Sequence, residues 1–599
     1  MNKIQSRPWI VVSSVVFLIL AFAPGSRAVT ILSPPSFTPA AKAPLAGVLE
    51  LTTDVASRVH VLVSDGSSIW EKDFYDFATT HSETLLGFKP GRTNVIQVTV
   101  IGRQRNVETA PQLLTFVTAP LPANFPHSVV LKSEPDQMEP GYTLFMVQNR
   151  TLHNNYITIM DNSGEVVWYS PAPNVNDADV KQMDDGDLFI VDSYNKRFLE
   201  INMLGETVET WYPPSGYPIN LHDGVPTDHG TILYISDVSR TVSNFPSSST
   251  VSNAPLKTVK IDDNPIVEIS MTNGALLNVW SPLDMLDPTH FSYLTYASTS
   301  TYGVDNEHAN AVIEDPTDDS LIVSLRTQNA VFKFARSTGQ VKWILGPPAN
   351  WGPDFQQLLL TPVGTPFEWN YAQHAPMLTP QGTLLVYDDG NYRASPFDSS
   401  VPDQANYSRA VEFGINETNM EVSQVWDSPQ SGADRLFTPI VGKVQWLPER
   451  RNVLVTYGYV TYINGVHPSP YSANATMVRI REFTHEPVPQ LVFDLSFFDY
   501  DNTSASYLGY VVYRSFRIPD LYAHPSNPEI ELFFSEENGT PYLQFSADPT
   551  QTYAIQASTD LVNWTTLGTA VPESSGGDYG FYDLNADHFT ERFYRVVVQ

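Results

Sequence analysis

The sequence predicts an all-β protein: a six-bladed β-propeller flanked by an N-terminal β-sandwich and a small C-terminal β-sandwich. Short apolar runs with period-two alternation are separated by Gly- and Asn-rich turns along the whole chain, and no long helical periodicity interrupts them. Between about residues 141 and 497 a four-stranded unit recurs, and six such units are typical of a propeller whose blades surround a central channel.

The first 28 residues have the order of a secretory signal peptide. Lys3 and Arg7 precede or open an apolar run from Trp9 to Phe22, and small residues follow as far as Ala28. The apolar run is short for a membrane helix, and no other segment reaches the roughly 18 residues that a span needs. We therefore expect an exported protein, periplasmic or extracellular, with no membrane span in the mature chain.

Changes in composition divide the rest of the chain. Alternating runs such as Val48–Thr53 and Val59–Val63 predict the N-terminal sandwich, and Pro541–Phe545 and Arg592–Val598 predict strands of the C-terminal one. The expected domains are the signal peptide (1–28), the N-terminal β-sandwich (29–118), a linker (119–140), the propeller (141–515), a second linker (516–526) and the C-terminal β-sandwich (527–599).

A tryptophan ends the same strand in five of the six repeats, and the sixth repeat, Met477 to Phe493, has lost it. Residues at matching positions of a repeat have matching environments, so we expect these indoles to pack in the core rather than to stack on a ligand. The unequal repeat lengths come from loops, chiefly Val238–Lys257 and Tyr392–Tyr407. The five tryptophans are Trp168, Trp211, Trp280, Trp343 and Trp426.

Charge and cysteine content exclude several classes of partner. The 599-residue chain has 34 basic and 65 acidic residues, a formal charge of −31. Such a surface repels nucleic acid and anionic lipid, so an anionic substrate needs a local positive site. The chain has no cysteine, which excludes disulfides, thiolate nucleophiles and thiolate metal sites. The sequence carries no indication of an oligomeric state.

Three histidines occupy the same register of successive repeats. His222 and His374 each precede the glycine of a hairpin turn by eight positions, and His308 precedes a slightly longer turn. Arg326 ends the strand that follows His308. Because repeats arranged around an axis bring one register together, we expect His222, His308, His374 and Arg326 to converge at the mouth of the channel.

Three imidazoles and a guanidinium favour an anion site, since arginine offers a planar fork of donors to an oxyanion. No carboxylate accompanies the histidines at the equivalent repeat position. Two alternatives remain open at this point. The histidines could ligate zinc with an open position for water, or they could merely pack and hydrogen-bond near the channel.

Several segments resemble the bacterial arylsulfotransferases, and the likeness is most specific between residues 300 and 395. The segments are Asn306–Val312, Asp318–Lys333, Val341–Gly346, Phe367–His374 and Gly382–Gly390. The resemblance implies a sandwich followed by a six-bladed propeller. It also implies transfer of a sulfuryl group from a phenolic sulfate ester to another phenol, without phosphoadenosine phosphosulfate. No cofactor or metal is expected, and the partners are a small aryl sulfate donor and a phenolic acceptor.

Carried over by motif, His374 resembles the family's nucleophile, which becomes transiently sulfated. His308, Arg326 and His222 resemble other active-site residues, and Asn310 resembles a substrate contact. The chain departs from the family in three respects. It lacks the cysteines that pair in well-known members, it has an additional C-terminal sandwich, and Asn306 stands where a tryptophan is usual. The rival hypotheses are a non-catalytic binding or scaffolding propeller and a metal-dependent hydrolase that uses the same channel.

Overall fold

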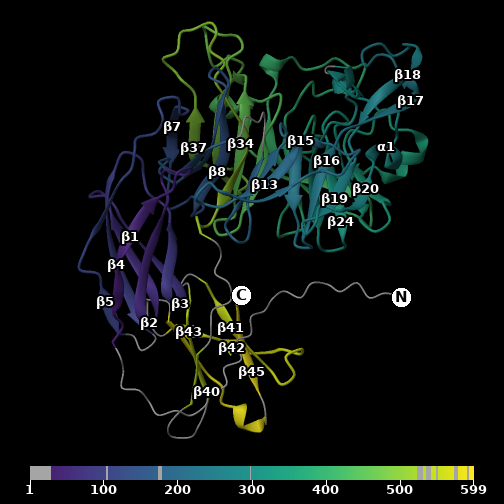
Figure 1. Cartoon of the computed structure of the whole chain (residues 1–599). Helices are drawn as coiled ribbons and strands as arrows, with labels where there is room; N and C mark the ends of the chain where they lie inside the picture. The colour runs from purple at the N-terminus through teal and green to yellow at the C-terminus, as the bar shows by residue number, and fades with distance from the viewer. Residues whose placement is uncertain are drawn as a thin grey trace.

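The structure is a computed structural model of the chain (Figure 1). The predicted signal peptide, residues 1–28, lies outside the described residues except for Ala28. The described residues are 28–102, 106–172, 179–296, 299–522, 531–534, 541–547, 551–572, 578–589 and 592–598.

Strands are the dominant regular structure of the described chain, which confirms the predicted all-β class at the level of secondary structure. Its helical segments are short: α1 (Pro282–Met285), η1 (Tyr293–Tyr296), η2 (Pro353–Leu358), η3 (Asp403–Ala405), η4 (Gly432–Asp434) and η5 (Ala586–His588). None of the helices in these residues is long and apolar enough to cross a membrane.

The N-terminal strands form one branched sheet. The 18-residue strand β2 pairs with β1 and β3 near its start and with β3 and β4 near its end, while β5 and β6 pair with β4. All six strands belong to one hydrogen-bonded sheet, because β2 is long enough to pair with two sets of partners. The strands are β1 (Ile31–Pro39), β2 (Gly47–Ser64), β3 (Ile69–Leu85), β4 (Thr93–Gly102), β5 (Val107–Thr109) and β6 (Leu114–Val117).

Six sheets of mainly antiparallel strands follow along the described chain, and we number them 1 to 6 in chain order. Sheet 1 contains β8 (Tyr142–Asn149), β9 (Asn154–Met160), β10 (Val166–Pro171) and β38 (Tyr510–Ile518). Sheet 2 contains β11 (Val180–Gln182), β12 (Leu188–Asp192), β13 (Arg197–Ile201) and β14 (Thr207–Trp211). Sheet 3 contains β15 (Ile219–Pro226), β16 (Thr231–Ser236), β19 (Ile266–Ser270) and β20 (Leu276–Trp280).

Sheets 4 to 6 continue the same order. Sheet 4 contains β23 (Ala309–Asp315), β24 (Ser320–Leu325), β25 (Ala330–Ala335) and β26 (Val341–Leu345). Sheet 5 contains β28 (His374–Leu378), β29 (Leu384–Asp388), β30 (Arg409–Asn416), β31 (Glu421–Asp427) and the short β27 (Thr361–Pro362). Sheet 6 contains β33 (Lys443–Leu447), β34 (Asn452–Val460), β36 (Met477–Thr484), β37 (Leu491–Phe497) and β7 (Ser128–Ser133).

Sheets 1 and 6 each contain a strand from a distant part of the chain. β38 pairs with β8 and completes sheet 1, although it follows sheet 6 in sequence. β7 pairs with β37 and forms the edge of sheet 6, although it precedes sheet 1. Residues 119–140, expected as a linker, therefore include a strand, and the predicted boundary at residue 515 falls inside β38.

The five tryptophans join each of the first five sheets to the next one. The indole of Trp168 donates to the carbonyl of Met203, that of Trp211 to Met271, and that of Trp280 to Arg336. Trp343 donates to the Glu417 carboxylate and Trp426 to the Glu486 carbonyl. All five indoles are buried, as expected. Each acceptor lies in the turn between the third and fourth strands of the following sheet.

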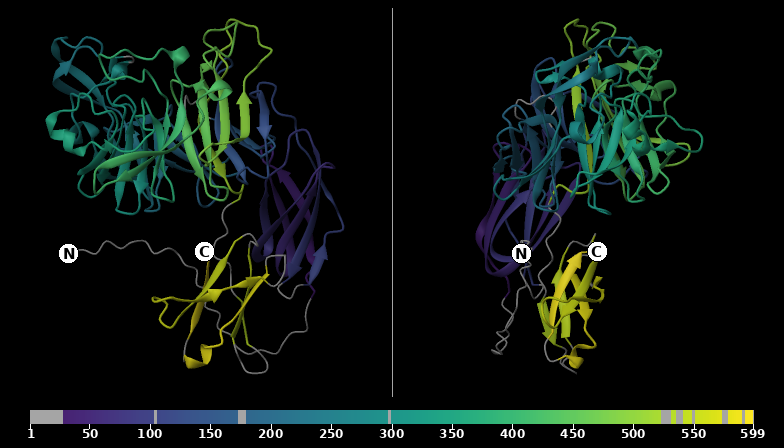
Figure 2. Two further views of the ribbon diagram at one scale, coloured as in Figure 1. Left: turned by 180° about the vertical axis from the view of Figure 1, so that it is seen from behind. Right: turned by 90° about the vertical axis from the view of Figure 1, so that its right-hand side faces the viewer.

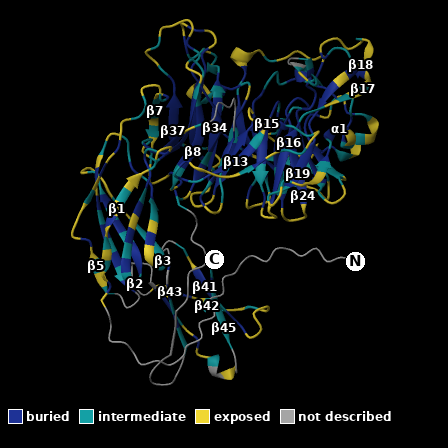
Figure 3. Cartoon of the chain, in the orientation of Figure 1, coloured by how far each residue is buried: buried dark blue, intermediate teal, exposed yellow. Residues whose placement is uncertain are grey.

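Insertions form small sheets of their own. The segment expected as a loop, Val238–Lys257, instead contains β17 and the start of β18, which pair with each other as a hairpin. The further strands are β17 (Val238–Pro246), β18 (Leu256–Asp263), β21 (Thr299–Ser300), β22 (Gly303–Val304), β32 (Leu436–Phe437) and β35 (Tyr462–Ile463). Many exposed residues lie in loops and turns, whereas the strands of the six numbered sheets are mostly buried (Figure 3).

The C-terminal residues form two small sheets with a separate apolar core of Leu543, Phe545, Tyr553, Ile555 and Tyr579 among others. They lie apart from the large array of sheets in both views of Figure 2. One sheet contains β39 (Glu531–Phe534), β40 (Pro541–Ser546), β43 (Val571–Pro572) and β44 (Asp578–Tyr582), and the other contains β41 (Tyr553–Ser558), β42 (Thr565–Thr569) and β45 (Phe593–Val598).

Candidate active site

The three histidines of the shared register lie where the first strands of sheets 3, 4 and 5 depart from regular pairing. His222 is in β15, His308 directly precedes β23, and His374 begins β28. At each histidine the pairing with the second strand shifts register, between Ile219 and Gly224, Ala309 and Ala311, and His374 and Met377. Such bulges bend a strand and re-aim its side chains. The φ angle of His308, 49°, is a further local departure from strand geometry.

His222 and His308 lie side by side. Their ring centroids are 4.6 Å apart at an angle of 49°. Nδ1 of His308 lies 2.6 Å from Oδ2 of Asp305, and Nδ1 of His222 lies 2.9 Å from the hydroxyl of Tyr513. Each imidazole is thus held through Nδ1 and keeps Nε2 for another contact.

His374 is held by a buried carboxylate, Asp389. Its Nδ1 lies 2.9 Å from Oδ2 of Asp389, although the two groups are not aligned for a strong hydrogen bond. Nε of Arg326 lies 3.7 Å from the same oxygen, and Nη2 of Arg326 donates to the carbonyl of Pro439 at 2.8 Å. Nη2 is therefore bonded to the protein, whereas Nε is buried without a hydrogen-bond partner.

Asn310 lies beside the backbone of His374. Its Nδ2 donates to the carbonyl of Gln373 at 2.7 Å, while its Oδ1 is buried without a hydrogen-bond partner. The carbonyl of Asn310 accepts a bond from Arg514 at 2.6 Å. Arg514 in turn contacts the carboxylates of Asp179 and Asp223 at 2.7 and 2.9 Å. This side chain comes from β38, so sheet 1 also contributes to the surroundings of the histidines.

Burial and nearby cations favour neutral imidazoles. Burial, together with Arg326, His222 and His308, lowers the pKa of His374 well below its ordinary value. Burial, His308 and Arg514 also lower the pKa of His222. Burial raises the pKa of Asp389 well above its ordinary value, and Arg326 partly offsets that rise. A neutral His374 keeps a lone pair for attack on an electrophile, and the nearby guanidinium favours an anion.

Two carboxylates lie against the histidines, although none was expected from the equivalent repeat position. Asp305 and Asp389 both lie within 3 Å of a histidine nitrogen. Asp389 directly follows the second strand of sheet 5, as Arg326 does in sheet 4 and Asp237 in sheet 3. That shared position was readable in the sequence. No local pattern pointed to Tyr513 and Arg514, because they arrive on a strand far along the chain.

The histidines do not form a compact metal-binding group. Within the described residues, their nitrogens are not among the sets of three ligand atoms that all lie within 4.8 Å of one another. A tetrahedral zinc ion needs its ligand atoms about 2 Å from one centre. The geometry thus gives no support to the zinc alternative.

A separate hollow lies at the opposite end of the same strands. It is lined by Asp315, Lys333, Leu378, Thr379 and Trp446, among others. Asp315 ends β23 and Leu378 ends β28, whereas His308 and His374 stand at the starts of those strands. The hollow is therefore distinct from the histidine site.

The sequence profile of the family Arylsulfotransferase (ASST) matches residues 127–503. This chain belongs to the arylsulfotransferase family. The match begins just before β7 and contains His222, His308, Arg326 and His374.

Two curated members of the arylsulfotransferase family are similar to this chain. An arylsulfate sulfotransferase AssT of Escherichia coli O6:H1 is 26% identical over 308 residues, 44% of this chain and 49% of that protein. An arylsulfate sulfotransferase AssT of Lelliottia amnigena is 26% identical over 314 residues, 45% of this chain and 50% of that protein. The chain thus spans about half the length of the curated relatives it matches.

Solved structures give only a distant likeness to this arylsulfotransferase-family chain. A Bacteroides caccae protein of unknown function has a TM-score of 0.35 and 12% identity, covering 63% of this chain and 98% of that chain. Hydrazine synthase of Kuenenia stuttgartiensis has a TM-score of 0.30 and 9% identity, covering 63% of this chain and 75% of that chain.

Proposed function

We propose that the protein is an aryl-sulfate sulfotransferase that works through a sulfated His374. The observation that carries the proposal is the gathering of two neutral, buried histidines and an arginine in a chain of the arylsulfotransferase family. His374 keeps Nε2 free because Nδ1 lies against Asp389. The donor is a phenolic sulfate ester, the acceptor is another phenol, and phosphoadenosine phosphosulfate plays no part.

We also propose that the six sheets are the blades of a propeller whose central channel opens at this site. β15 packs against β12, β23 against β15, β28 against β23, β33 against β28, and β38 against both β33 and β11. This order of neighbours, with each tryptophan directed to the next sheet, supports the proposal. The unit would run from β7 to β38, with the sandwich before it and the C-terminal module after it, in a protein exported to the periplasm or beyond.

In the first half-reaction, Nε2 of His374 attacks sulfur and the bond from sulfur to the aryl oxygen breaks. Sulfuryl transfer should resemble phosphoryl transfer, with a loose in-line transition state and charge spread over the equatorial oxygens. Arg326 and the neutral His222 are the proposed donors to those oxygens, with Asn310 nearby as a substrate contact. Protonated His308, paired with Asp305 at 2.6 Å, gives its proton to the leaving phenolate.

In the second half-reaction, the acceptor phenol enters and His308 takes its proton. The phenolate oxygen attacks sulfur, the bond from sulfur to nitrogen breaks, and His374 returns to its neutral form. While His374 carries the sulfuryl group, its positive ring favours the carboxylate form of Asp389, which lies 2.9 Å from Nδ1 and opposes that charge. The scheme predicts ping-pong kinetics.

The test follows 4-nitrophenol released from 4-nitrophenyl sulfate by the purified protein, together with intact mass, with and without phenol. We expect release that depends on phenol and a sulfuryl adduct that maps to His374. His374→Asn should lose both without unfolding. The matched control is His229→Asn, since His229 lies exposed in a turn of sheet 3.

Normal turnover by His374→Asn would overturn the nucleophile assignment. Loss of activity after dialysis against EDTA at 25 °C would point instead to a metal-dependent hydrolase. If several phenols gave neither 4-nitrophenol release nor a sulfuryl adduct, a non-catalytic binding propeller would be the better explanation of the function.

A further inference from the structure

Sheets 2, 3 and 5 carry a buried glutamate at the same register of their third strand, and so does sheet 6, where Glu482 lies opposite Leu454. Glu200 of sheet 2 lies opposite Phe189, Glu268 of sheet 3 opposite Leu233, and Glu412 of sheet 5 opposite Leu385. All four glutamates are buried. A buried carboxylate is costly unless donors or cations surround it, so each of these positions needs compensation.

Glu268 and Glu412 have that compensation. Glu268 accepts bonds from Thr231 and Asn278, both at 2.8 Å, and from Arg336 at 2.5 Å. Glu412 accepts a bond from Thr383 and pairs with His485. In both sheets the hydroxyl comes from a threonine that lies two residues before the strand partner of the glutamate. The basic side chain comes from the next sheet.

Glu200 has none of these donors. The position of Thr231 is occupied in sheet 2 by Asp187, two residues before Phe189. The position of Asn278 is occupied by Glu209, the strand partner of Glu200. Met271 stands in sheet 3 where Arg336 stands in sheet 4. The backbone carbonyl of each accepts a hydrogen bond from the tryptophan indole of the preceding sheet.

Among the described residues no hydrogen bond or ion pair is made by the Glu200 carboxylate, although the exposed fraction of this residue is only 9%. Its carboxylate is instead directed at Asp185 and Asp187, and one oxygen from each of the three groups lies within 4.8 Å of the others. Asp185 and Asp187 stand in the turn between β11 and β12, where Gly186 takes a φ of 87°. Asp185 is exposed, so an ion has a path from solvent.

Three carboxylates this close together repel one another, and burial adds to the cost of a negative charge on Glu200. A cation bound between the three groups would offset both costs.

We propose that Asp185, Asp187 and Glu200 bind a divalent cation, Ca²⁺, in sheet 2. The ligand set is oxygen only, as hard cations prefer, and water completes the coordination on the exposed side. Ca²⁺ tolerates the irregular geometry of three carboxylates on a turn and a strand, whereas Mg²⁺ demands a near-ideal octahedron. The ion replaces the threonine, amide and guanidinium donors of sheet 3, and this site is independent of the proposed sulfuryl transfer.

The test titrates CaCl₂ into purified protein freed of metal with EDTA, followed by calorimetry and by the unfolding temperature. We expect one ion per chain and a dissociation constant of about 10⁻⁴ to 10⁻³ M, the range of extracellular calcium modules. The ion should raise the Tm, because a ligand that binds only the folded state stabilises it. A KCl solution of equal ionic strength should give a smaller rise.

Two kinds of variant make the test specific. Asp185→Asn and Glu200→Gln should weaken Ca²⁺ at least tenfold. The double variant Asp187→Thr with Glu209→Asn installs the donors of sheet 3, and it should abolish the Ca²⁺ response while keeping or raising the Tm without the ion. Asp228→Asn, in the equivalent exposed turn of sheet 3, is the control and should bind Ca²⁺ as the wild type does. No saturable heat in the wild type, or an equal Tm rise with KCl, would overturn the proposal.

Discussion

At the residue scale, the side chain that decides what His374 can do is Asp389. An imidazole attacks through one nitrogen only, and the partner of the other nitrogen fixes which one is free. Asp389 is fully buried, lies 2.9 Å from Nδ1 of His374 and also stands 3.7 Å from Arg326. It therefore links the proposed nucleophile to the proposed anion-binding residue, and we regard it as a positioning residue.

Asp389→Asn should lower kcat for aryl-sulfate turnover by about 10²-fold, because a small misplacement of a reacting group has an effect of that order. KM should change little, since the variant leaves Arg326 and His308 in place. Steady-state kinetics across pH 5–9 would measure both constants, with the exposed Asp354→Asn as control. A purely structural role would instead lower the Tm and leave kcat per folded molecule unchanged.

The register of the histidines made part of this site predictable. His222, His308 and His374 were recognisable because each precedes a hairpin at a fixed distance, and the structure brings His222 and His308 to 4.6 Å. Tyr513 and Arg514 were not recognisable. They reach the site through pairing of β38 with β8, a contact between residues more than 360 positions apart, and no local pattern encodes such a pairing.

At the element scale, the connection between sheets 3 and 4 contains a buried histidine of a different kind. His290 follows α1, stacks on Trp351 with ring centroids 3.8 Å apart, and lies 3.2 Å from the carbonyl of Gln328. Burial lowers its pKa to about 4. The folded protein thus keeps His290 neutral at pH values where the unfolded chain protonates it.

His290 should therefore contribute a pH-dependent part of the stability. Its contribution is fully present above the unfolded pKa of about 6.5 and is lost as the pH falls toward 4, by up to roughly 3 kcal/mol. Urea unfolding of the wild type and of His290→Gln at pH 7.5 and pH 4.5 measures it. The destabilisation caused by the substitution should shrink at the lower pH, and a difference independent of pH would contradict the assignment.

The sequence predicted the regular elements better than the inserted ones. Strands that end in tryptophan were recognisable because the same pattern recurs, and their indole bonds explain why the residue is repeated. The segment Val238–Lys257 was expected as a loop because serine and asparagine dominate it. Its two strands instead pair with each other, since the backbone bonds of a hairpin do not depend on apolar side chains.

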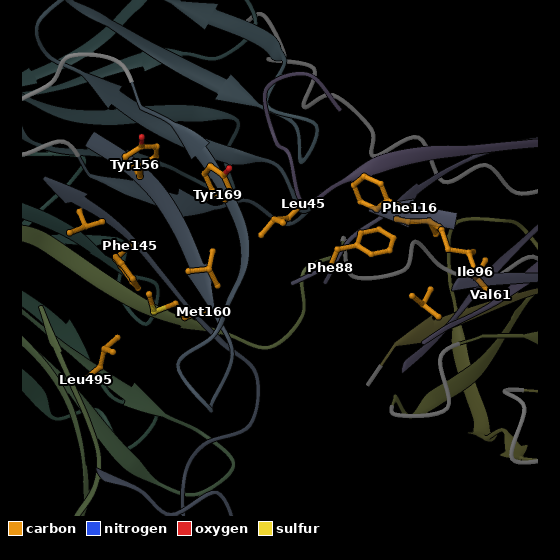
Figure 4. Close-up of a cluster of buried hydrophobic side chains, with 14 of the residues drawn as sticks. Leu45, Val61, Phe88, Ile96, Phe116, Phe145, Tyr156, Met160, Tyr169 and Leu495 are labelled. Carbon is orange, nitrogen blue, oxygen red and sulfur yellow. The ribbon is translucent and has the colours of Figure 1, made fainter. Parts of the chain in front are cut away.

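At the scale of the whole molecule, one apolar core joins the N-terminal sheet to sheets 1 and 6. Leu45 and Phe88 belong to the N-terminal region, Phe145 and Met160 to sheet 1, and Leu495 to sheet 6, and all belong to one cluster (Figure 4). The C-terminal module has its own core of Leu543, Phe545 and neighbours. The N-terminal region should therefore unfold with the large array, whereas the C-terminal module should not.

Two truncations test this division. A chain that ends at residue 526 should keep the main unfolding transition, because it retains β38 and loses only the separate core. A chain that ends at residue 509 lacks β38, leaves β8 without its partner and removes Arg514, so it should fail to give that transition. Circular dichroism and calorimetry would compare them. Similar unfolding of both chains would contradict the role given to β38.

The order of the sheets along the chain was predictable from the repeats, but the distant strands that complete the first and last sheets were not. β7 lay in a stretch expected as a linker because proline and polar residues surround it. It forms an edge strand, with only one partner, and edge strands tolerate such composition. The sequence likewise gave no sign that β2 would serve two sets of partners in the N-terminal sheet.

The indole bonds also provide the protein with built-in optical probes. Trp168, Trp211, Trp280, Trp343 and Trp426 each report on the seam between two sheets rather than on one sheet, because their acceptors belong to the neighbour. Emission from these indoles should follow the separation of sheets. Since the chain has no cysteine, a single introduced thiol would accept a fluorescent label at any chosen seam without competition.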